Sequence, residues 1–269
     1  MNYHSDKWIM DRLQEHYNEA LESFPEDRIV CLALQGSQNY GLDTLTSDID
    51  TKLVVCPTFY DIAMNRQPVS TTHVRENNEH IDFKDVRLML KTFRKANLNF
   101  LEILFSNYCI INPLYVSEWN RLIAHNEEIA RYDKLRAIKS MEGLAHRKFA
   151  NLENCSPSHE VDIKKFGYSP KELHHLLRIE EYLERYISGE SYSNCLLSKQ
   201  ADYLKDIKSG ILSLDEARIL ATHKMSYITN LCNAQERKWD KNDINEKVNE
   251  LLDDVQYKIM EIAIKKELL

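Results

Sequence analysis

The sequence predicts a mixed α+β protein, in which an N-terminal part with a small sheet precedes a helical C-terminal region. Short apolar runs that are typical of strands are concentrated within residues 28–86. After Pro113 the apolar residues instead recur at the three- and four-residue spacing of amphipathic helices. We therefore expect two domains, residues 1–112 and 113–269, with a border near residues 108–113.

The N-terminal part is expected to begin with a helix and to continue with strands. Residues 7–23 carry apolar side chains at helical spacing. Residues 28–35 are short and apolar and end at Gly36, which is typical of a buried strand. The remaining expected elements are strands at residues 48–56, 69–74 and 79–86, then helices at residues 86–97 and 99–106.

The C-terminal region is expected to be a set of helices. Ser169 and Pro170 supply an N-cap and a first-turn proline for one of them, and Ser213 supplies a cap for another. The expected helices are residues 115–125, 127–153, 169–187, 214–234 and 244–268. Residues 155–168 are expected to form a long loop.

Composition limits the possible functions. The net charge is -7 and the pI is about 5.8, whereas a protein that binds nucleic acid mainly through its charge is usually basic. None of the 6 cysteines belongs to a Cys-x-x-Cys pair, which argues against a zinc ribbon or a redox motif. No apolar run has membrane length and the charged N-terminus is unlike a signal peptide, so we expect no membrane contact and a cytoplasmic location.

The segment LQGSQNYGLDTLTSDID contains the strongest candidate site. Asp48 and Asp50 flank Ile49 on an expected strand, so both carboxylates share one face while Ile49 faces the core. Two carboxylates this close repel each other unless a cation lies between them, and Mg²⁺ prefers such oxygen ligands. The same two-residue period places Asp82 on the polar face of a neighbouring strand, which makes it the candidate third ligand.

The turn before these aspartates adds a candidate phosphate site. Gly36 permits backbone angles that other residues avoid, and it lets a ligand approach closely. The Ser37 hydroxyl and nearby backbone N–H groups are suited to terminal phosphate oxygens. Most Asp-x-Asp pairs on strands and most Gly-Ser turns have no catalytic role, but their combination in this order and spacing is more specific.

This combination resembles the signature of the DNA polymerase β-like nucleotidyltransferase superfamily: an apolar strand, Gly-Ser, about ten residues and then Asp-apolar-Asp. The fuller form, Gly-Ser-x-x-Tyr-Gly-x-x-Thr-x-x-Ser-Asp-x-Asp, is similar to the RNA repair pathway polymerase β family of bacteria and phages. The matching residues are Gly36, Ser37, Tyr40, Gly41, Thr44, Ser47, Asp48 and Asp50.

Two further blocks extend the resemblance to about residue 178. The first resembles the family's Asn-Pro-Asn-x-x-Glu-x-Leu-x-Ser segment, although Leu98 replaces the proline; its matching residues are Asn97, Asn99, Glu102 and Ser106. The second resembles the family's Gly-Tyr-x-x-Lys-x-x-x-His-x-x-Arg, and its matching residues are Gly167, Tyr168, Lys171, His175 and Arg178. The last three line one face of a helix, which in an unmatched sequence would usually be a solvated face.

The resemblance implies a nucleotidyltransferase-type αβ domain with a small mixed sheet, and a helical domain that completes the nucleotide and acceptor cleft. Asp48, Asp50 and Asp82 would be catalytic and would hold two Mg²⁺ or Mn²⁺ ions. An acceptor hydroxyl would attack the α-phosphate of a nucleoside triphosphate and expel pyrophosphate. The nucleotide-binding residues would be Gly36, Ser37, Tyr40, Ser47, Lys171, His175 and Arg178.

The acceptor stays open between an RNA end such as that of a tRNA, a protein side chain and a small molecule, and the oligomeric state stays open too. A catalytically silent nucleotide-binding or scaffold protein of the same fold is the first alternative, although the presence of all three aspartates argues against it. A metal-dependent phosphohydrolase is the second, although hydrolysis has no general need for a triphosphate-binding turn before Asp48.

Overall fold

The computed structural model describes residues 3–154, 160–240 and 243–269. It has the mixed α+β architecture that the sequence predicts, with helices dominating the C-terminal region. The chain divides into two compact units. The first comprises Met1–Asp133 together with Asn245–Leu269, and the second comprises Lys134–Ile244.

The described strands of the first unit form a five-stranded mixed sheet with the order β3-β4-β2-β1-β5. Strands β2 and β4 are parallel, and the other neighbours are antiparallel. The strands are β1 (Ile29–Gln35), β2 (Asp50–Val55), β3 (Ser70–Val74), β4 (His80–Asp85) and β5 (Cys109–Ile111). The first four match expected strands, whereas β5 lies in the expected border because three residues are too few to show a period.

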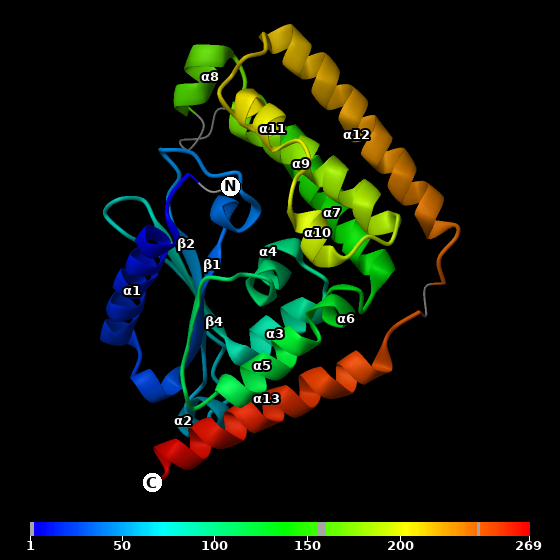
Figure 1. Cartoon of the computed structure of the whole chain (residues 1–269). Coiled ribbons are helices and arrows are strands. Elements are labelled where there is room, and N and C mark those ends of the chain that lie inside the picture. The colour runs from blue at the N-terminus through cyan, green and yellow to red at the C-terminus, as the bar shows by residue number, and fades with distance from the viewer. Residues whose placement is uncertain (1–2, 155–159, 241–242) are drawn as a thin grey trace. The chain divides into compact units, whose positions relative to one another are not determined.

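Helix α1 (Asp6–Ser23) covers one face of this sheet (Figure 1). The core that it forms with the sheet consists of Ile9, Leu13, Tyr17, Ala20, Ile29, Leu32, Leu34, Ile49, Leu53, Val55 and Ile81. Strand side chains alternate between the two faces, so the residues between these core positions on β2 and β4 point to the other side. Among them are Asp50, Lys52 and Asp82, and this other side carries the candidate site.

Helix α3 (Val86–Arg94) packs against β2 and β4. Asp85 caps it by accepting a hydrogen bond from the Arg87 backbone N–H at 2.9 Å. The other helices before the second unit are α2 (Phe59–Ala63), α4 (Leu98–Leu101), α5 (Val116–Ala124), α6 (Asn126–Ala130) and the 3₁₀ helices η1 (Glu26–Arg28), η2 (Ser37–Tyr40) and η3 (Glu102–Leu104).

The C-terminal helix α13 (Glu246–Glu267) returns to the first unit and packs against α3 and α5 (Figure 1). Arg94 Nε donates to Asn249 Oδ1 at 2.7 Å, and Arg121 Nη2 donates to Asp254 Oδ2 at 2.7 Å. The division of the chain therefore differs from the expected border between residues 112 and 113. Contacts between segments this far apart in sequence leave no trace in a local pattern.

The second unit is organised around helix α9 (Pro170–Ile187). Its buried residues include Leu173, Leu176 and Tyr182, and Ser169 caps it as predicted. The helices that pack against it are α7 (Lys134–Ala150), α10 (Tyr192–Leu196), α11 (Ala201–Lys208) and α12 (Leu214–Glu236).

Two expectations about this region are wrong. The loop expected at residues 155–168 contains helix α8 (Glu160–Phe166), in which Lys164 pairs with Glu160 one turn earlier; residues 155–159 of that loop lie outside the described residues. The single helix expected at residues 127–153 is interrupted between α6 and α7, where the Tyr132 carbonyl accepts a hydrogen bond from the Asn245 N–H. None of the helices in the described ranges combines the length and apolar character that a membrane crossing requires.

Candidate active site

Asp50 is the first residue of β2, whereas Asp48 lies two residues before it, outside the strand that was expected to begin at residue 48. Ile49 between them is fully buried in the core, Asp48 is exposed, and the Asp50 side chain is 32% exposed. Asp50 Oδ1 accepts hydrogen bonds from the His80 backbone N–H at 3.0 Å and from His80 Nδ1 at 2.9 Å. Burial and then the negative charge of Asp48 raise the pKa of Asp50 despite these bonds. The two carboxylates are therefore close enough to repel each other.

The Gly-Ser turn is joined to this pair of aspartates. Gly36 has φ 107° and ψ -158°, and the 3₁₀ helix η2 begins at Ser37. The buried Gln38 amide donates from Nε2 to the Asp48 carbonyl at 2.7 Å. The Ser37 hydroxyl is partly exposed and makes no hydrogen bond to any other described residue. The turn is thus tied through the Gln38 side chain to the backbone of Asp48.

Substituting Gly36 with alanine is expected to lower the free energy of unfolding by about 1–3 kcal/mol, because its backbone angles are accessible essentially to glycine alone. Gly143→Ala is the matched control. Gly143 lies on the exposed side of α7 with open space at the Cβ position, so the added methyl group is expected to stabilise by about 0.5–1 kcal/mol. Urea denaturation measures the free energy of unfolding of both variants. Equal changes in the two variants would contradict the expectation that only glycine adopts the backbone angles at residue 36.

Tyr40 and Ser47 are predicted to contact the nucleotide, and in the structure both have a role in the fold. Tyr40 is buried at 6% exposure, a location typical of a packing role. Ser47 Oγ accepts a hydrogen bond from the Thr44 N–H at 2.9 Å and so closes the loop that leads into Asp48. A direct contact of either residue with a nucleotide stays a prediction.

Asp82 points to the same side of the sheet as Asp50, as predicted, but its carboxylate already has partners. Its Oδ2 lies 2.9 Å from Lys52 Nζ, and its Oδ1 accepts the Thr72 hydroxyl. Burial alone would raise the pKa of Asp82, yet the Lys52 ammonium and the Thr72 hydroxyl hold that pKa below its ordinary value. Within the described ranges, no three Asp, Glu, His or Cys side chains are gathered closely enough to hold a metal ion.

A buried polar network supports the backbone between the two aspartates from the α1 side. Glu79 Oε1 accepts a hydrogen bond from the Ile49 N–H at 3.3 Å. Its other oxygen pairs with Arg12 of α1, with Arg75 Nη1 at 2.7 Å and with His16 Nε2 at 3.0 Å. Glu79 is 4% exposed, so the two arginines compensate a carboxylate that has lost its water. The network fixes the peptide that separates Asp48 from Asp50.

Lys171, His175 and Arg178 line one side of α9 in the second unit, as predicted. Lys171 is exposed, whereas His175 and Arg178 are partly exposed. Burial lowers the pKa of His175 well below its ordinary value, and the charges of Lys148, Arg178 and Lys171 add to this effect. Lys171 and Arg178 therefore carry the positive charge on this side of α9.

Lowering the pH is expected to destabilise the second unit, because His174 is buried in its neutral form. His174 Nδ1 donates to the Leu204 carbonyl at 2.8 Å, and burial lowers the pKa of His174 from 6.5 to about 4. The unfolded chain binds this proton first, so stability that is present above pH 6.5 is lost as the pH falls toward 4. We expect a loss of about 2 kcal/mol by pH 5. NMR titration of the ring tests this, and an ordinary pKa would contradict it.

Several family-matching residues serve the fold. Gly167 has φ +80°, and a Cβ there would lie 3.2 Å from Leu214 Cδ2. Tyr168 is buried, and its hydroxyl donates to the Leu212 carbonyl at 3.1 Å. Asn97 caps α4 through the Asn99 N–H at 3.1 Å. These residues need no ligand to account for their presence.

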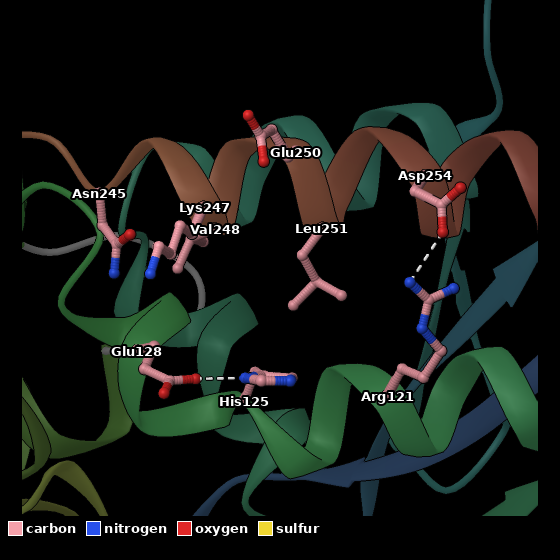
Figure 2. Close-up of a pocket in the computed structure, with 9 residues that line it drawn as sticks. All are labelled: Arg121, His125, Glu128, Asn245, Lys247, Val248, Glu250, Leu251 and Asp254. Carbon is pink, nitrogen blue, oxygen red and sulfur yellow. Dashed lines mark hydrogen bonds and ion pairs between the residues drawn. The ribbon is translucent and has the colours of Figure 1, made fainter.

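A cavity of about 400 Å³ lies elsewhere in the first unit, between α13 and the helices α5 and α6 (Figure 2). Figure 2 shows Leu251 of α13 pointing into it and the ion pair of Arg121 with Asp254 at one end. His125, bonded to Glu128, lies across the cavity from α13. None of the residues predicted to act in catalysis or nucleotide binding lines this cavity. It is therefore separate from the candidate active site.

Three residues at the site had no predicted role: Lys52, Glu79 and His80. Lys52 follows Asp50 by two positions, so the strand period already placed its side chain on the same face. His80 is on the predicted polar face of β4, but its bond to Asp50 depends on the parallel pairing of β2 with β4. Glu79 has no local signal, because two of its partners come from α1.

The sequence matches no protein-family model. It also matches no curated protein. A crystal structure of a nucleotidyltransferase-like protein from Exiguobacterium sibiricum 255-15 shows a partial likeness, with 11% sequence identity and a TM-score of 0.33 over 84% of this chain and 75% of that chain. A likeness at this level assigns no function.

Proposed function

We propose that the protein is a metal-dependent nucleotidyltransferase, which moves a nucleoside monophosphate from a nucleoside triphosphate to an acceptor hydroxyl and releases pyrophosphate. The observation that carries the proposal is that Asp48 and Asp50 lie close together, joined through Gln38 to the turn at Gly36 and Ser37. A bound triphosphate needs cations for its charge and donors for its oxygens, and these two parts would supply both.

The side chains of Asp48 and Asp50 fit a divalent cation. No described residue donates a hydrogen bond to the Asp48 carboxylate or to Asp50 Oδ2, so these oxygens are open. Burial and then the negative charge of Asp48 raise the pKa of Asp50, and a bound cation would offset that repulsion between the two carboxylates. Mg²⁺ or Mn²⁺ held there would offset charge on the substrate phosphates and polarise the reacting one.

Other side chains would hold the substrate and the carboxylates in place. The Ser37 hydroxyl would donate to the terminal phosphates, and His80 would keep Asp50 oriented through its two hydrogen bonds. Lys171 and Arg178 stay proposed contacts for phosphate groups of a nucleotide or of an RNA acceptor, because both are cations on one side of α9. The acidic net charge favours a limited RNA contact or a protein acceptor over extended duplex binding.

Product analysis with labelled nucleotides tests the proposal. The protein would be incubated with Mg²⁺ or Mn²⁺, cellular RNA, and each nucleoside triphosphate labelled at either the α- or the γ-phosphate. Nucleotidyl transfer predicts α-label on RNA, on protein or on a small product, and γ-label in pyrophosphate. Free phosphate with no labelled acceptor would instead indicate a phosphohydrolase, and nucleotide binding without turnover would indicate a silent binding protein.

A further inference from the structure

A lysine side chain occupies the cation position beside Asp82. Lys52 and Asp82 face each other in the parallel register of β2 and β4, and Lys52 Nζ lies 2.9 Å from Asp82 Oδ2. The Lys52 side chain is only 2% exposed. The Phe100 ring of α4 covers the ammonium, with 4.2 Å between Nζ and the ring centre. The ammonium is thus held from two sides.

Both oxygens of the Asp82 carboxylate already have a partner. Lys52 occupies one oxygen and the Thr72 hydroxyl the other. Lys84, whose Nζ lies 5.5 Å from the centre of the same Phe100 ring, brings a second positive charge to this region. A divalent ion on Asp82 would have to displace the buried Lys52 ammonium from its partner and would leave that ammonium without a counter-ion.

We propose that the Lys52 ammonium takes the place of a second metal ion at this site. Asp48 and Asp50 would then hold a single divalent ion, while Lys52 neutralises Asp82 and supplies a fixed positive charge on the same face of β2. This inference rests on the proposed function, because it concerns the number of ions at that site. It replaces the expectation that Asp82 is a metal ligand, which the sequence alone favoured.

Counting bound Mn²⁺ tests the inference without measuring activity. Electron paramagnetic resonance would follow Mn²⁺ binding to the full chain in the presence of a nonhydrolysable nucleoside triphosphate analogue. We expect one site in the wild type and still one in Asp82→Asn, because Asp82 is not a ligand. Lys52→Met is expected to free Asp82 and open a second site, which the double variant Lys52→Met/Asp82→Asn should lose again.

The controls separate this inference from the proposed function. Circular dichroism would check folding, and Lys52→Arg should keep one ion because it keeps the charge. The inference would be overturned if the wild type bound two ions and Asp82→Asn only one. It would also be overturned if Lys52→Met still bound only one ion, and in both cases the proposed function would stand. Absence of Mn²⁺ binding in every variant would overturn the metal site of the proposed function and this inference with it. If Lys52→Met or Asp82→Asn fails to fold, the double variant Lys52→Met/Asp82→Asn is compared with the wild type. A double variant that binds one ion fewer than the wild type would contradict the inference.

Discussion

Replacing Glu79 with glutamine is expected to lower the free energy of unfolding by about 3 kcal/mol. The Glu79 carboxylate is buried and pairs with Arg12, with Arg75 at 2.7 Å and with His16 at 3.0 Å. Glutamine keeps the shape of the side chain but removes its charge, so two guanidinium groups lose a buried counter-ion. Urea denaturation followed by circular dichroism measures the effect.

The same carboxylate predicts a loss of stability in acid. Burial alone would raise the pKa of Glu79, but hydrogen bonds from His16 and Arg12 hold that pKa well below its ordinary value of 4.5. A carboxylate with a depressed pKa contributes stability that is present above its unfolded-state pKa and is lost as the pH falls below it. The wild type should therefore lose stability below about pH 4.5 more steeply than Glu79→Gln.

Glu76→Gln is the matched control for Glu79→Gln. Glu76 lies in the same β3–β4 connection but is exposed, and none of the described residues bonds its carboxylate. Its substitution is expected to change stability by less than about 0.5 kcal/mol. If Glu79→Gln changed the free energy of unfolding as little as Glu76→Gln, this would contradict the role of the Glu79 network in fixing the peptide at Ile49.

Replacing Asp50 with asparagine is expected to weaken Mn²⁺-dependent nucleotide binding by at least about 100-fold, since even outer-shell partners of metal ligands typically change affinity 10–100-fold. Thermal stability should stay unchanged or rise. Burial and the charge of Asp48 raise the pKa of Asp50, so the folded protein without metal already disfavours its ionised form. Isothermal titration calorimetry and thermal unfolding measure the two effects.

Asp11→Asn serves as the control for Asp50→Asn. Asp11 is an exposed residue of α1 whose side chain pairs with Lys7, and its substitution should leave both affinity and stability near the wild-type values. A fall in stability of Asp50→Asn comparable to its loss of binding would indicate that Asp50 holds the fold together and has no role as a ligand.

The parts of the site that depend on local alternation could be predicted from the sequence. The two-residue period placed Ile49 in the core and Asp50 on the other face, and it separated Asp82 from the cap residue Asp85. These positions follow from strand geometry, which is a property of neighbouring residues.

The parts that depend on pairing between distant segments could not be predicted. The contact of Lys52 with Asp82 exists because β2 and β4 run parallel with these two residues opposite each other. The role of Glu79 depends on cations that α1 delivers, and α13 joins the first unit through contacts with α3 and α5. In each case the deciding partner lies at least thirty residues away, outside the reach of any local pattern.

Metal-dependent release of pyrophosphate tests the proposed reaction most directly. The wild type, Asp50→Asn and Asp11→Asn would be compared with each nucleoside triphosphate and cellular RNA over a range of Mg²⁺ concentrations. The proposed reaction predicts pyrophosphate release by the wild type and by Asp11→Asn that depends on Mg²⁺, and release at least about 100-fold slower in folded Asp50→Asn. Equal release by the wild type and Asp50→Asn would contradict a catalytic site at Asp48 and Asp50.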